Sequence, residues 1–370
     1  MLVNKKHYKT IWLDENDNTV IRVIDQRKLP FKFEIAELRS TEDVYAAIDG
    51  MAVRGAPLIG AAAAFGIYLS TLEINSHTNI RDHVSNAARY LASCRPTAVN
   101  LSWAVNHSLA KLNFNDPVEL ISEAALNTAL EICELETENC RKIGINGLRL
   151  IEDIAAKKNG ETVNILTHCN AGWLACIDYG TATAPVYMAK EKGIKVHVWV
   201  DETRPRNQGS KLTAWELGEN GIPYTLITDN TGGHLMQHGM VDLVLVGCDR
   251  ATRQGDVANK IGTYLKALAA NDNNIPFYAV IPSTSIDFSI SDGVKEIVVE
   301  ERDPAEVTEI TGWSDGEIKT VRICPEDAIA ANYGFDVTPS RLITGIITEN
   351  GICSASEEGL KELFPEKFID

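Results

Sequence analysis

A carboxylate after an apolar run is the first sign of chemistry in this 370-residue chain. Residues 243–246 are all apolar, and Asp249 follows shortly after them. An amide and an ammonium then stand side by side, at Asn259 and Lys260. Burial raises the pKa of a carboxyl group, which can then serve as a general acid or base. The segment therefore indicates a strand that ends in an active site. A polar turn, with Asp249 capping a helix or paired with Arg250, is the alternative.

Similar polar ends follow other apolar, β-branched runs in the second half of the chain. We expect strands at 162–168, 195–200, 224–228, 242–247 and 276–281, separated by helices near 174–192, 208–220, 232–239 and 256–271. This alternation predicts a parallel, doubly wound sheet. The polar ends are His168-Cys169-Asn170, Asp201-Glu202-Thr203-Arg204, Thr228-Asp229-Asn230, Cys248-Asp249-Arg250 and Ser283-Thr284-Ser285. Because ligands bind beyond the carboxyl ends of the strands in such sheets, these residues together indicate one site.

Cys169 stands at one of these strand ends, just before Asn170. A helix that starts near Trp173 would point its backbone N–H groups at the thiol and lower its pKa, which favours the reactive thiolate. The chain has eight cysteines and no CxxC pair, which is typical of reduced thiols in the cytoplasm. Most of the others are expected to be buried and structural. A catalytic role is therefore predicted for Cys169.

A second candidate site lies near the N-terminus. The run Arg54-Gly55-Ala56-Pro57 precedes the Ala-rich segment 58–69, which we expect to form a buried helix. Backbone N–H groups at the start of that helix, together with the Arg54 guanidinium, would bind a phosphate, although a simple helix start fits the spacing equally well. The nearby glycines have Walker A spacing, but the Lys-Ser/Thr ending is absent, so an ATP-binding loop is not supported. Segment 58–69 is also shorter than the roughly twenty residues of a membrane span.

Two other patterns favour no site of their own. His234 and His238 are spaced to share a helix face, but the Glu of the zinc-protease motif is missing, so we expect no metal there. Asp201 and Glu202 resemble the carboxylate pair of a glycosidase. Adjacent residues on a strand point to opposite faces, however, which makes them a poor pair.

Length, composition and charge limit the class of protein. The length favours two domains, and 45% hydrophobic with 23% charged residues is typical of a folded globular protein. We predict a mostly helical N-terminal domain at 1–155, with a short β-like opening at 19–23, and a Rossmann-like α/β domain at 156–370. The net charge of -16 argues against nucleic acid and anionic membranes as partners. The N-terminus has no signal-peptide core, so we expect a cytoplasmic protein.

Several segments carry a resemblance to one family over nearly the whole chain. They are Arg54-Gly55-Ala56-Pro57, the run from Arg95 to Leu101, His168-Cys169-Asn170, Asp201-Glu202-Thr203-Arg204-Pro205 with Gln208-Gly209, the run from Leu212 to Leu217, the run from Gly255 to Tyr264, and the run from Phe335 to Pro339. In these segments the chain resembles the methylthioribose-1-phosphate isomerase family. That family shares its fold with ribose-1,5-bisphosphate isomerase and with the regulatory α, β and δ subunits of the guanine-nucleotide exchange factor of eukaryotic translation initiation.

The resemblance implies which residues act. It makes Cys169 and Asp249 the catalytic pair, and the regulatory subunits do not keep these two residues, so an enzyme is favoured over a non-catalytic regulatory relative. It further implies that the sugar 1-phosphate is bound by Arg54, Gly55, Ala56, Arg95, Gln208, Asn259 and Lys260, with the last two at the start of a helix. A homodimer, no metal or other cofactor, and a role in methionine salvage are implied as well.

The implied reaction converts 5-methylthioribose 1-phosphate into 5-methylthioribulose 1-phosphate. The phosphate ester on the anomeric oxygen prevents the ring from opening to a free aldehyde, so an acid must act at the ring oxygen. We expect a protonated Asp249 to supply that proton and Cys169 to move the proton that leaves C2, while Arg54, Arg95 and Lys260 hold the phosphate. A hydride shift from C2 to C1 is the rival mechanism.

Three departures from the common family pattern bear on the substrate. Ala171-Gly172-Trp173 replaces the usual Thr-Gly-Ser, Cys248 replaces a small residue, and the segment 229–234 is atypical. We expect these changes at the wall of the pocket. They leave 5-deoxyribose 1-phosphate open as a substrate, alone or beside the methylthio sugar, because apolar pockets discriminate such groups weakly.

Overall fold

The computed structural model describes residues 1–74, 79–95 and 98–369. Pro96 and Thr97, from one of the quoted segments, lie outside these ranges. The N-terminal part contains strands β1 (Leu2–Val3), β2 (Lys6–His7), β3 (Ile11–Leu13), β4 (Ile21–Ile24) and β5 (Ile35–Leu38), and helices α1 (Thr41–Asp49), α2 (Ala56–Leu72), α3 (Ile80–Ser93), α4 (Val99–Lys111) and α5 (Val118–Lys157). The expected helical character is confirmed. The β opening is larger than the expected 19–23, because β3, β4 and β5 form an antiparallel sheet.

Helix α2 is the central helix of the N-terminal part. Its residues are apolar or small on all sides, and every one except Leu72 is buried, as expected for segment 58–69. Pro57 lies in its first turn, where a missing N–H costs nothing. The helices α1, α3, α4 and α5 pack around it, so the start of α2 is held firmly against the rest of the molecule.

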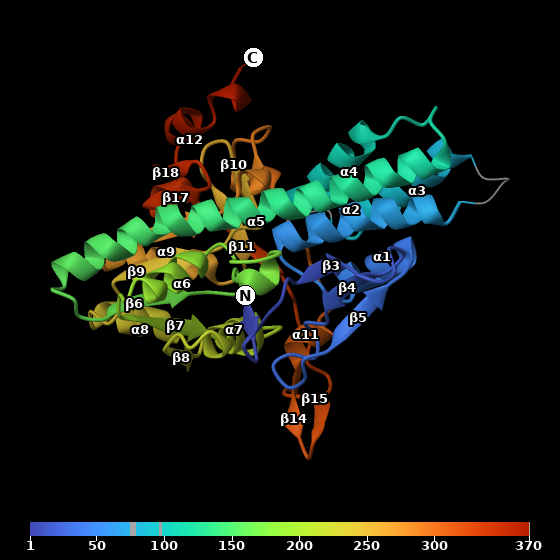
Figure 1. Cartoon of the computed structure of the whole chain (residues 1–370). Coiled ribbons are helices and arrows are strands. Elements are labelled where there is room, and N and C mark those ends of the chain that lie inside the picture. The colour runs from blue at the N-terminus through green and yellow to red at the C-terminus, as the bar shows by residue number, and fades with distance from the viewer. Residues whose placement is uncertain (75–78, 96–97, 370) are drawn as a thin grey trace.

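Helix α5 connects the two parts of the chain. Figure 1 shows it crossing the molecule diagonally, from beside α2 and α4 to the parallel sheet. Its first half contributes Ile121 and Ile132 to the core around α2, and its second half contributes Ile143 and Ile151 to the core under the sheet. A domain boundary near residue 155 stays a prediction, because one continuous helix takes part in both cores.

The C-terminal part is built on a seven-stranded sheet. Its strands are β6 (Val163–Thr167), β7 (Val196–Asp201), β8 (Tyr224–Ile227), β9 (Leu243–Val246), β12 (Phe277–Val280), β17 (Gly345–Thr348) and β18 (Gly351–Cys353). The order is β18-β17-β12-β9-β6-β7-β8, and only the β17–β18 pair is antiparallel. Without β18 this is the strand order of a Rossmann fold, which confirms the predicted sheet. The order reverses between β6 and β9.

Helices cover both faces of this sheet. They are α6 (Ala184–Glu191), α7 (Ala214–Glu219), α8 (Thr231–Gln237), α9 (Thr263–Asp272) and α12 (Glu357–Leu363). Side chains of α5, α6 and α7 join one face of the sheet in a common core, and those of α8, α9 and α12 join the other. Alternate residues of β6, β9 and β12 enter the two cores in turn, as the period of a strand requires. Within the described residues, no helix is long and apolar enough to cross a membrane.

Two of the expected helices are shorter than predicted. The helix at 256–271 is wrong in its first part, because β11 (Val257–Lys260) is a strand that pairs with β10 (Arg250–Thr252) and β16 (Phe335–Thr338). Asn259 and Lys260 therefore lie on a strand, and α9 begins after Gly262, whose φ of 102° suits only glycine.

The expected helix at 174–192 is also wrong in its first part. Only a single 3₁₀ turn forms at Trp173–Ala175, and α6 starts at Ala184. Tyr179 and Gly180 both have positive φ, which interrupts any helix between the two elements.

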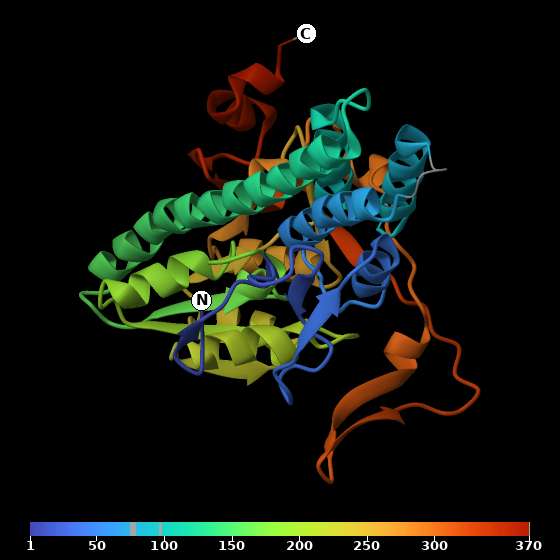
Figure 2. The same cartoon turned by 45° about the vertical axis from the view of Figure 1, so that its right-hand side comes forward.

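A second sheet and a hairpin had no counterpart in the predictions. The sheet has the order β13-β10-β11-β16, with β13 at Ile286–Asp287. The hairpin β14 (Glu309–Ser314) and β15 (Glu317–Arg322) follows the short helices α10 (Gly293–Glu296) and α11 (Ala305–Thr308), and Figures 1 and 2 show it projecting from the body. Its base is held by Glu306, which pairs with Arg206 and Arg302. Hydrogen bonds from these arginines lower the pKa of Glu306 to about 2, against the effect of burial.

Candidate active site

The two predicted catalytic residues lie where the strand order reverses. Cys169 follows β6 and Asp249 follows β9, and these strands pair directly through Ile165 with Leu243 and Leu166 with Val244. Because the strands are parallel, both residues reach the same edge of the sheet, and they line one small cavity. Such an edge is where ligands of α/β proteins bind. The active site expected at the strand ends is thus compatible with the geometry.

Most of the other predicted binding residues surround this cavity. Arg54, Gly55, Ala56 and Asn259 line it together with Cys169 and Asp249. Lys260 and Arg95 do not line it, but both act electrostatically on the Asp249 carboxyl group. Gln208 lies in a neighbouring cavity that shares Arg54 with the first. The fold therefore divides the predicted set: most of its members line the first cavity, Gln208 lines the second, and Lys260 and Arg95 line neither.

Cys169 has a strained backbone that two threonines hold in place. Its φ of 68° lies in the left-handed region, which costs a non-glycine residue about 1–3 kcal/mol. The Cys169 N–H donates to Thr203 Oγ1 at 2.8 Å, and Thr213 Oγ1 donates to the Cys169 carbonyl at 2.7 Å. Thr203 has a positive φ of its own, 65°, and is fully buried. The two hydroxyl groups fix the direction in which the thiol leaves the main chain.

The predicted lowering of the Cys169 pKa is wrong. Burial raises the pKa of the thiol, while the charges of Arg54 and Lys260 oppose the rise. The prediction assumed a helix pointing at the thiol, whereas the turn at Trp173–Ala175 is too short to set up a substantial dipole. The thiolate is therefore stabilised by the charges of Arg54 and Lys260 and, to a smaller extent, by a backbone hydrogen bond from Asn170.

Asp249 is a partly buried acid that forms no ion pair with any residue that the structure describes. Burial raises the pKa of its carboxyl group above the usual value, and the charges of Lys260, Arg95 and Arg54 oppose the rise. Its carboxylate accepts no hydrogen bond from any residue that the structure describes. Arg250 pairs with Asp287 instead, so the alternative of an Asp249–Arg250 ion pair is wrong. The carboxyl group is free to exchange a proton with a ligand in the cavity.

Arg54 and the start of α2 form the cationic wall of the cavity. The Arg54 guanidinium donates to Asn170 Oδ1 at 2.6 Å and to the Asn170 carbonyl at 2.8 Å. Gly55 caps α2 with a φ of 98°, and a Cβ there would lie 2.5 Å from the backbone of Ala175, so only glycine fits. The first N–H groups of the helix and one fixed guanidinium are well suited to a phosphate.

Lys260 and Arg95 form a second cationic group behind Asp249. Lys260 Nζ donates to the Gly334 carbonyl at 2.8 Å and lies over the Phe335 ring, 4.7 Å from its centre. Arg95 pairs with Glu300 at 3.3 Å and faces the same ring. Burial lowers the pKa of Lys260, and the neighbouring Cys169 and Asp249 raise it. Sequence reasoning missed Glu300 because it follows no motif and reaches the site only through the fold.

A buried charged cluster supports the ends of β6 and β7. His168 bonds through its two ring nitrogens to Asp201 Oδ2 and to the Ile261 carbonyl, both at 2.8 Å. His168, Asp201 and Asp229 lie close enough together to hold a metal ion. Lys266 Nζ, however, already lies 3.1 Å from the same Asp201 oxygen, so we assign the cluster a positioning role.

The predicted histidine pair lies elsewhere. His238 Nδ1 bonds to the carbonyl of His234, and their rings are 4.2 Å apart at the end of α8. Neither ring reaches the cavity, and the metal-competent group found within the described ranges does not include them.

Thr203→Val removes one of the two hydroxyl groups that hold Cys169. A buried N–H left without an acceptor costs about 1–3 kcal/mol. We therefore expect turnover to fall at least about ten-fold while KM changes little, because the thiol loses its position and the phosphate contacts remain. Thr203→Ser keeps the hydroxyl and should restore turnover. An unchanged turnover in the folded valine variant, checked by circular dichroism, would contradict the positioning role.

Comparisons with known proteins identify relatives that match this chain over nearly its full length. A methylthioribose-1-phosphate isomerase of Desulfatibacillum aliphaticivorans is 56% identical over 367 residues, covering 99% of this chain and 100% of the relative. A methylthioribose-1-phosphate isomerase of Sinorhizobium medicae is 57% identical over 369 residues, with 99% and 100% covered.

Solved structures show the same architecture. The crystal structure of 5-methylthioribose 1-phosphate isomerase from Pyrococcus horikoshii superposes with a TM-score of 0.83 at 38% identity, covering 98% of this chain and 97% of that one. A structure described as translation initiation factor eIF-2B, subunit delta, from A. fulgidus gives 0.78 at 38% identity, with 97% and 100% covered. The model of the initiation factor 2 subunit family matches residues 52–355. The chain is similar to methylthioribose-1-phosphate isomerases over their full length. It therefore belongs to the initiation factor 2 subunit family.

Proposed function

We propose that this protein is an aldose–ketose isomerase of methionine salvage, which converts 5-methylthioribose 1-phosphate into 5-methylthioribulose 1-phosphate. The observation that carries the proposal is the pairing of β6 with β9, which brings Cys169 and Asp249 to one cavity. The names of the similar full-length relatives support the substrate. Asp249 and Cys169 are both present, which favours an enzyme over a regulatory relative.

The first step opens the sugar ring. Asp249 donates its proton to the ring oxygen while the bond from that oxygen to C1 breaks, and positive charge develops at C1 beside the phosphate ester. Burial favours the protonated acid. The phosphate of the substrate adds negative charge nearby and favours it further. Arg54, Arg95 and Lys260 hold that phosphate and keep the sugar over the acid.

The second step moves hydrogen from C2 to C1. The Cys169 thiolate takes the proton from C2, which leaves an enol phosphate with a double bond between C1 and C2. The proton then returns from the thiol to C1, and the C2 hydroxyl gives its own proton to the Asp249 carboxylate as the C2 carbonyl forms. Both groups end in their starting states, so the cycle needs no further reactant.

A second candidate substrate is 5-deoxyribose 1-phosphate. The cavity wall includes Ala171 and Cys248, two of the departures from the family pattern, next to Ala175 and Cys176. These side chains are small and weakly polar. An apolar wall discriminates by only about 1–3 kcal/mol of binding free energy for each small group that a substrate gains or lacks. Both sugars are therefore reasonable substrates.

Cys169→Ser and Asp249→Asn test the assignment with both sugars. We expect the wild-type protein to turn over at least one of the two sugar phosphates. Each variant should fold normally and lose about 10²–10⁴-fold in kcat, the usual contribution of a general acid or base. Product formation can be followed by NMR. Losses below ten-fold in both variants, or no turnover of either sugar by the wild type, would refute the proposed roles.

The pH dependence of the reaction follows from the two raised pKa values. The reactive form carries one proton, on Asp249, and a deprotonated Cys169. Below the lower pKa, that of Asp249, both groups are protonated, and above the higher pKa, that of Cys169, both have lost their protons. Because neither of these states is reactive, kcat/KM falls on both sides. Burial raises both pKa values, from 3.8 for the acid and from 9.0 for the thiol. We therefore expect the alkaline limb above the ordinary thiol pKa of 9.0. A limb at neutral pH, in protein shown to stay folded, would contradict this assignment.

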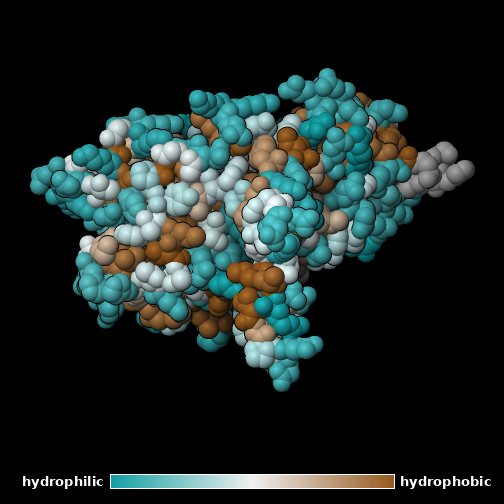
Figure 3. Space-filling view, turned by 90° about the horizontal axis from the view of Figure 1, so that it is seen from below, coloured by the Kyte–Doolittle hydropathy of each residue, from teal (hydrophilic) through white to brown (hydrophobic). Residues whose placement is uncertain are grey.

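We further propose that the protein is a cytoplasmic homodimer that pairs through the β8 edge of the sheet. β8 has a neighbour only on the β7 side, and its Tyr224 and Leu226 are 39% and 47% exposed. Met240, whose carbonyl accepts a hydrogen bond from Trp199 on β7, is 41% exposed. Figure 3 shows brown hydrophobic patches on the lower face, the side on which Figure 1 places β7 and β8. An exposed apolar edge is a typical pairing surface. All eight cysteines are free thiols, which supports the cytoplasm.

Leu226→Lys tests this edge. A lysine buried in the interface would lose its water, so we expect the dimer to dissociate at least ten times more readily, as measured by sedimentation velocity. Leu265→Lys on α9 is the matched control, because Leu265 is 59% exposed away from β8 and should leave the dimer intact. A monomeric wild type, or a Leu226→Lys dimer as stable as the control, would rule out the β8 interface.

A further inference from the structure

A second cavity adjoins the catalytic one. The two share Arg54, and the second is also lined by Arg27, Arg206 and Lys211, with Gln208 and Thr311 among its other residues. Four cationic side chains therefore face this space, and none of the described residues that line it carries a carboxylate. Thr311 belongs to the projecting hairpin, so strand β14 forms one wall.

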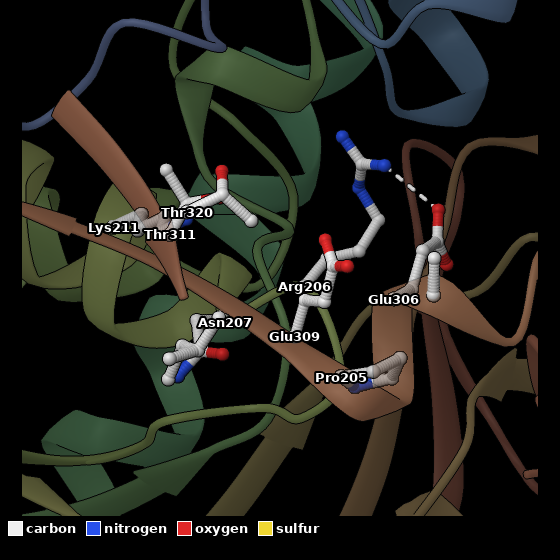
Figure 4. A pocket seen from close by; sticks show the side chains of 10 residues that line it. Pro205, Arg206, Asn207, Lys211, Glu306, Glu309, Thr311 and Thr320 are labelled. Atoms are coloured by element: carbon white, nitrogen blue, oxygen red, sulfur yellow. Dashed lines mark hydrogen bonds and ion pairs between the residues drawn. The ribbon is translucent and has the colours of Figure 1, made fainter. Parts of the chain in front are cut away.

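Lys211 differs from the other cations of this cavity. Arg27 pairs with Asp25, Arg54 bonds to Asn170, and Arg206 pairs with Glu306. Within the described residues, Lys211 Nζ has no carboxylate within 4.0 Å and no hydrogen-bond acceptor. Figure 4 looks into another cavity that Lys211 also lines, and there a dashed line joins Arg206 to Glu306 while none reaches Lys211. The ammonium is half-buried and has lost part of its water without gaining a partner.

The electrostatic surroundings of Lys211 add to this cost. Burial lowers the pKa of its ammonium group, and the charges of Arg206 and Arg204 lower it further. The carboxylates of Glu306 and Glu309, which line the space beyond Lys211, are too distant to form an ion pair with it. An anion in the cavity would offset the repulsion among these cations.

The local backbone connects Lys211 to the catalytic thiol. A π turn covers Gly209–Thr213, and such turns frequently occur at functional sites. It places Lys211 and Leu212 on the second cavity, while Thr213 at its end bonds to the Cys169 carbonyl. Gly209 is required at its start, because a Cβ there would lie 1.6 Å from the Asp201 carbonyl oxygen. A ligand bound at Lys211 thus lies on the same turn that positions Cys169.

We propose that the second cavity is a phosphate-binding subsite in which Lys211 supplies the principal charge. This rests on the proposed function, which makes a phosphorylated sugar the ligand that enters past Arg54. The bound group is either a free inorganic phosphate beside the substrate, or the phosphate of the substrate itself, which then lies between Arg54 and Lys211 in place of Arg95 and Lys260. Gln208, predicted from the family resemblance to bind the sugar phosphate, lines the same subsite.

Titration calorimetry with inorganic phosphate tests the subsite without any turnover. We expect the wild type to bind phosphate and Lys211→Met to bind it at least ten-fold more weakly, the loss expected for one charge-assisted hydrogen bond. Lys211→Arg should retain binding, which also shows that the turn tolerates substitution. Lys111→Met, an exposed lysine at the end of α4, is the control and should bind like the wild type.

Steady-state kinetics then identify the source of the phosphate. If KM for methylthioribose 1-phosphate rises in Lys211→Met by the same factor as the loss of phosphate affinity, the subsite binds the substrate's own phosphate. If KM is unchanged, the subsite binds free phosphate. Wild-type protein that binds no phosphate, or Lys211→Met that binds it as tightly as Lys111→Met, overturns the proposal. Phosphate binding together with no turnover of the sugar would refute the proposed function and leave the subsite standing.

Discussion

The direct pairing of β6 with β9 is the constraint on which the site depends. The connection after β6 leads to helices on one face of the sheet, and the connection after β9 leads to the other face, so a crevice opens between them. Cys169 and Asp249 are the polar residues that follow these two strands. The start of α2, anchored by a helix that is buried except at Leu72, closes the crevice with Arg54. Without this pairing the thiol and the acid would not line the same cavity.

Burial and nearby cations act against one another throughout the site. Burial raises the pKa of Asp249 and of Cys169 and lowers that of Lys260. The charges of Arg54, Arg95 and Lys260 partly offset this effect on the Asp249 carboxylate, and those of Arg54 and Lys260 partly offset it on the Cys169 thiolate. An acid whose pKa is raised by burial and a thiolate stabilised by Arg54 and Lys260 suit proton transfer within one cavity. Entry of a phosphate changes this balance, which links substrate binding to the protonation of the acid.

The sequence was sufficient for the parts of the fold that depend on local pattern. Apolar, β-branched runs gave β6, β7, β8, β9 and β12 to within a residue or two, and the polar residue types at their ends predicted the site edge. Asn259 and Lys260 were placed on a helix, because a short strand between two glycines has no periodicity of its own. The hairpin was missed since most of β15 is exposed. The roles of Thr203 and Thr213 had no signal, because a hydroxyl that bonds to a distant backbone group follows no spacing rule.

The structure of the protein with 5-methylthioribulose 1-phosphate in the cavity tests the central claim most directly. The account predicts that C2 lies in van der Waals contact with Cys169 Sγ, at roughly 3.5 Å, the separation of reacting atoms in a near-attack complex. The oxygen that closes the ring should lie within about 3 Å of an Asp249 carboxyl oxygen, a hydrogen-bond distance. A sugar whose C2 faces neither residue, or whose ring-closing oxygen lies away from Asp249, would contradict the account.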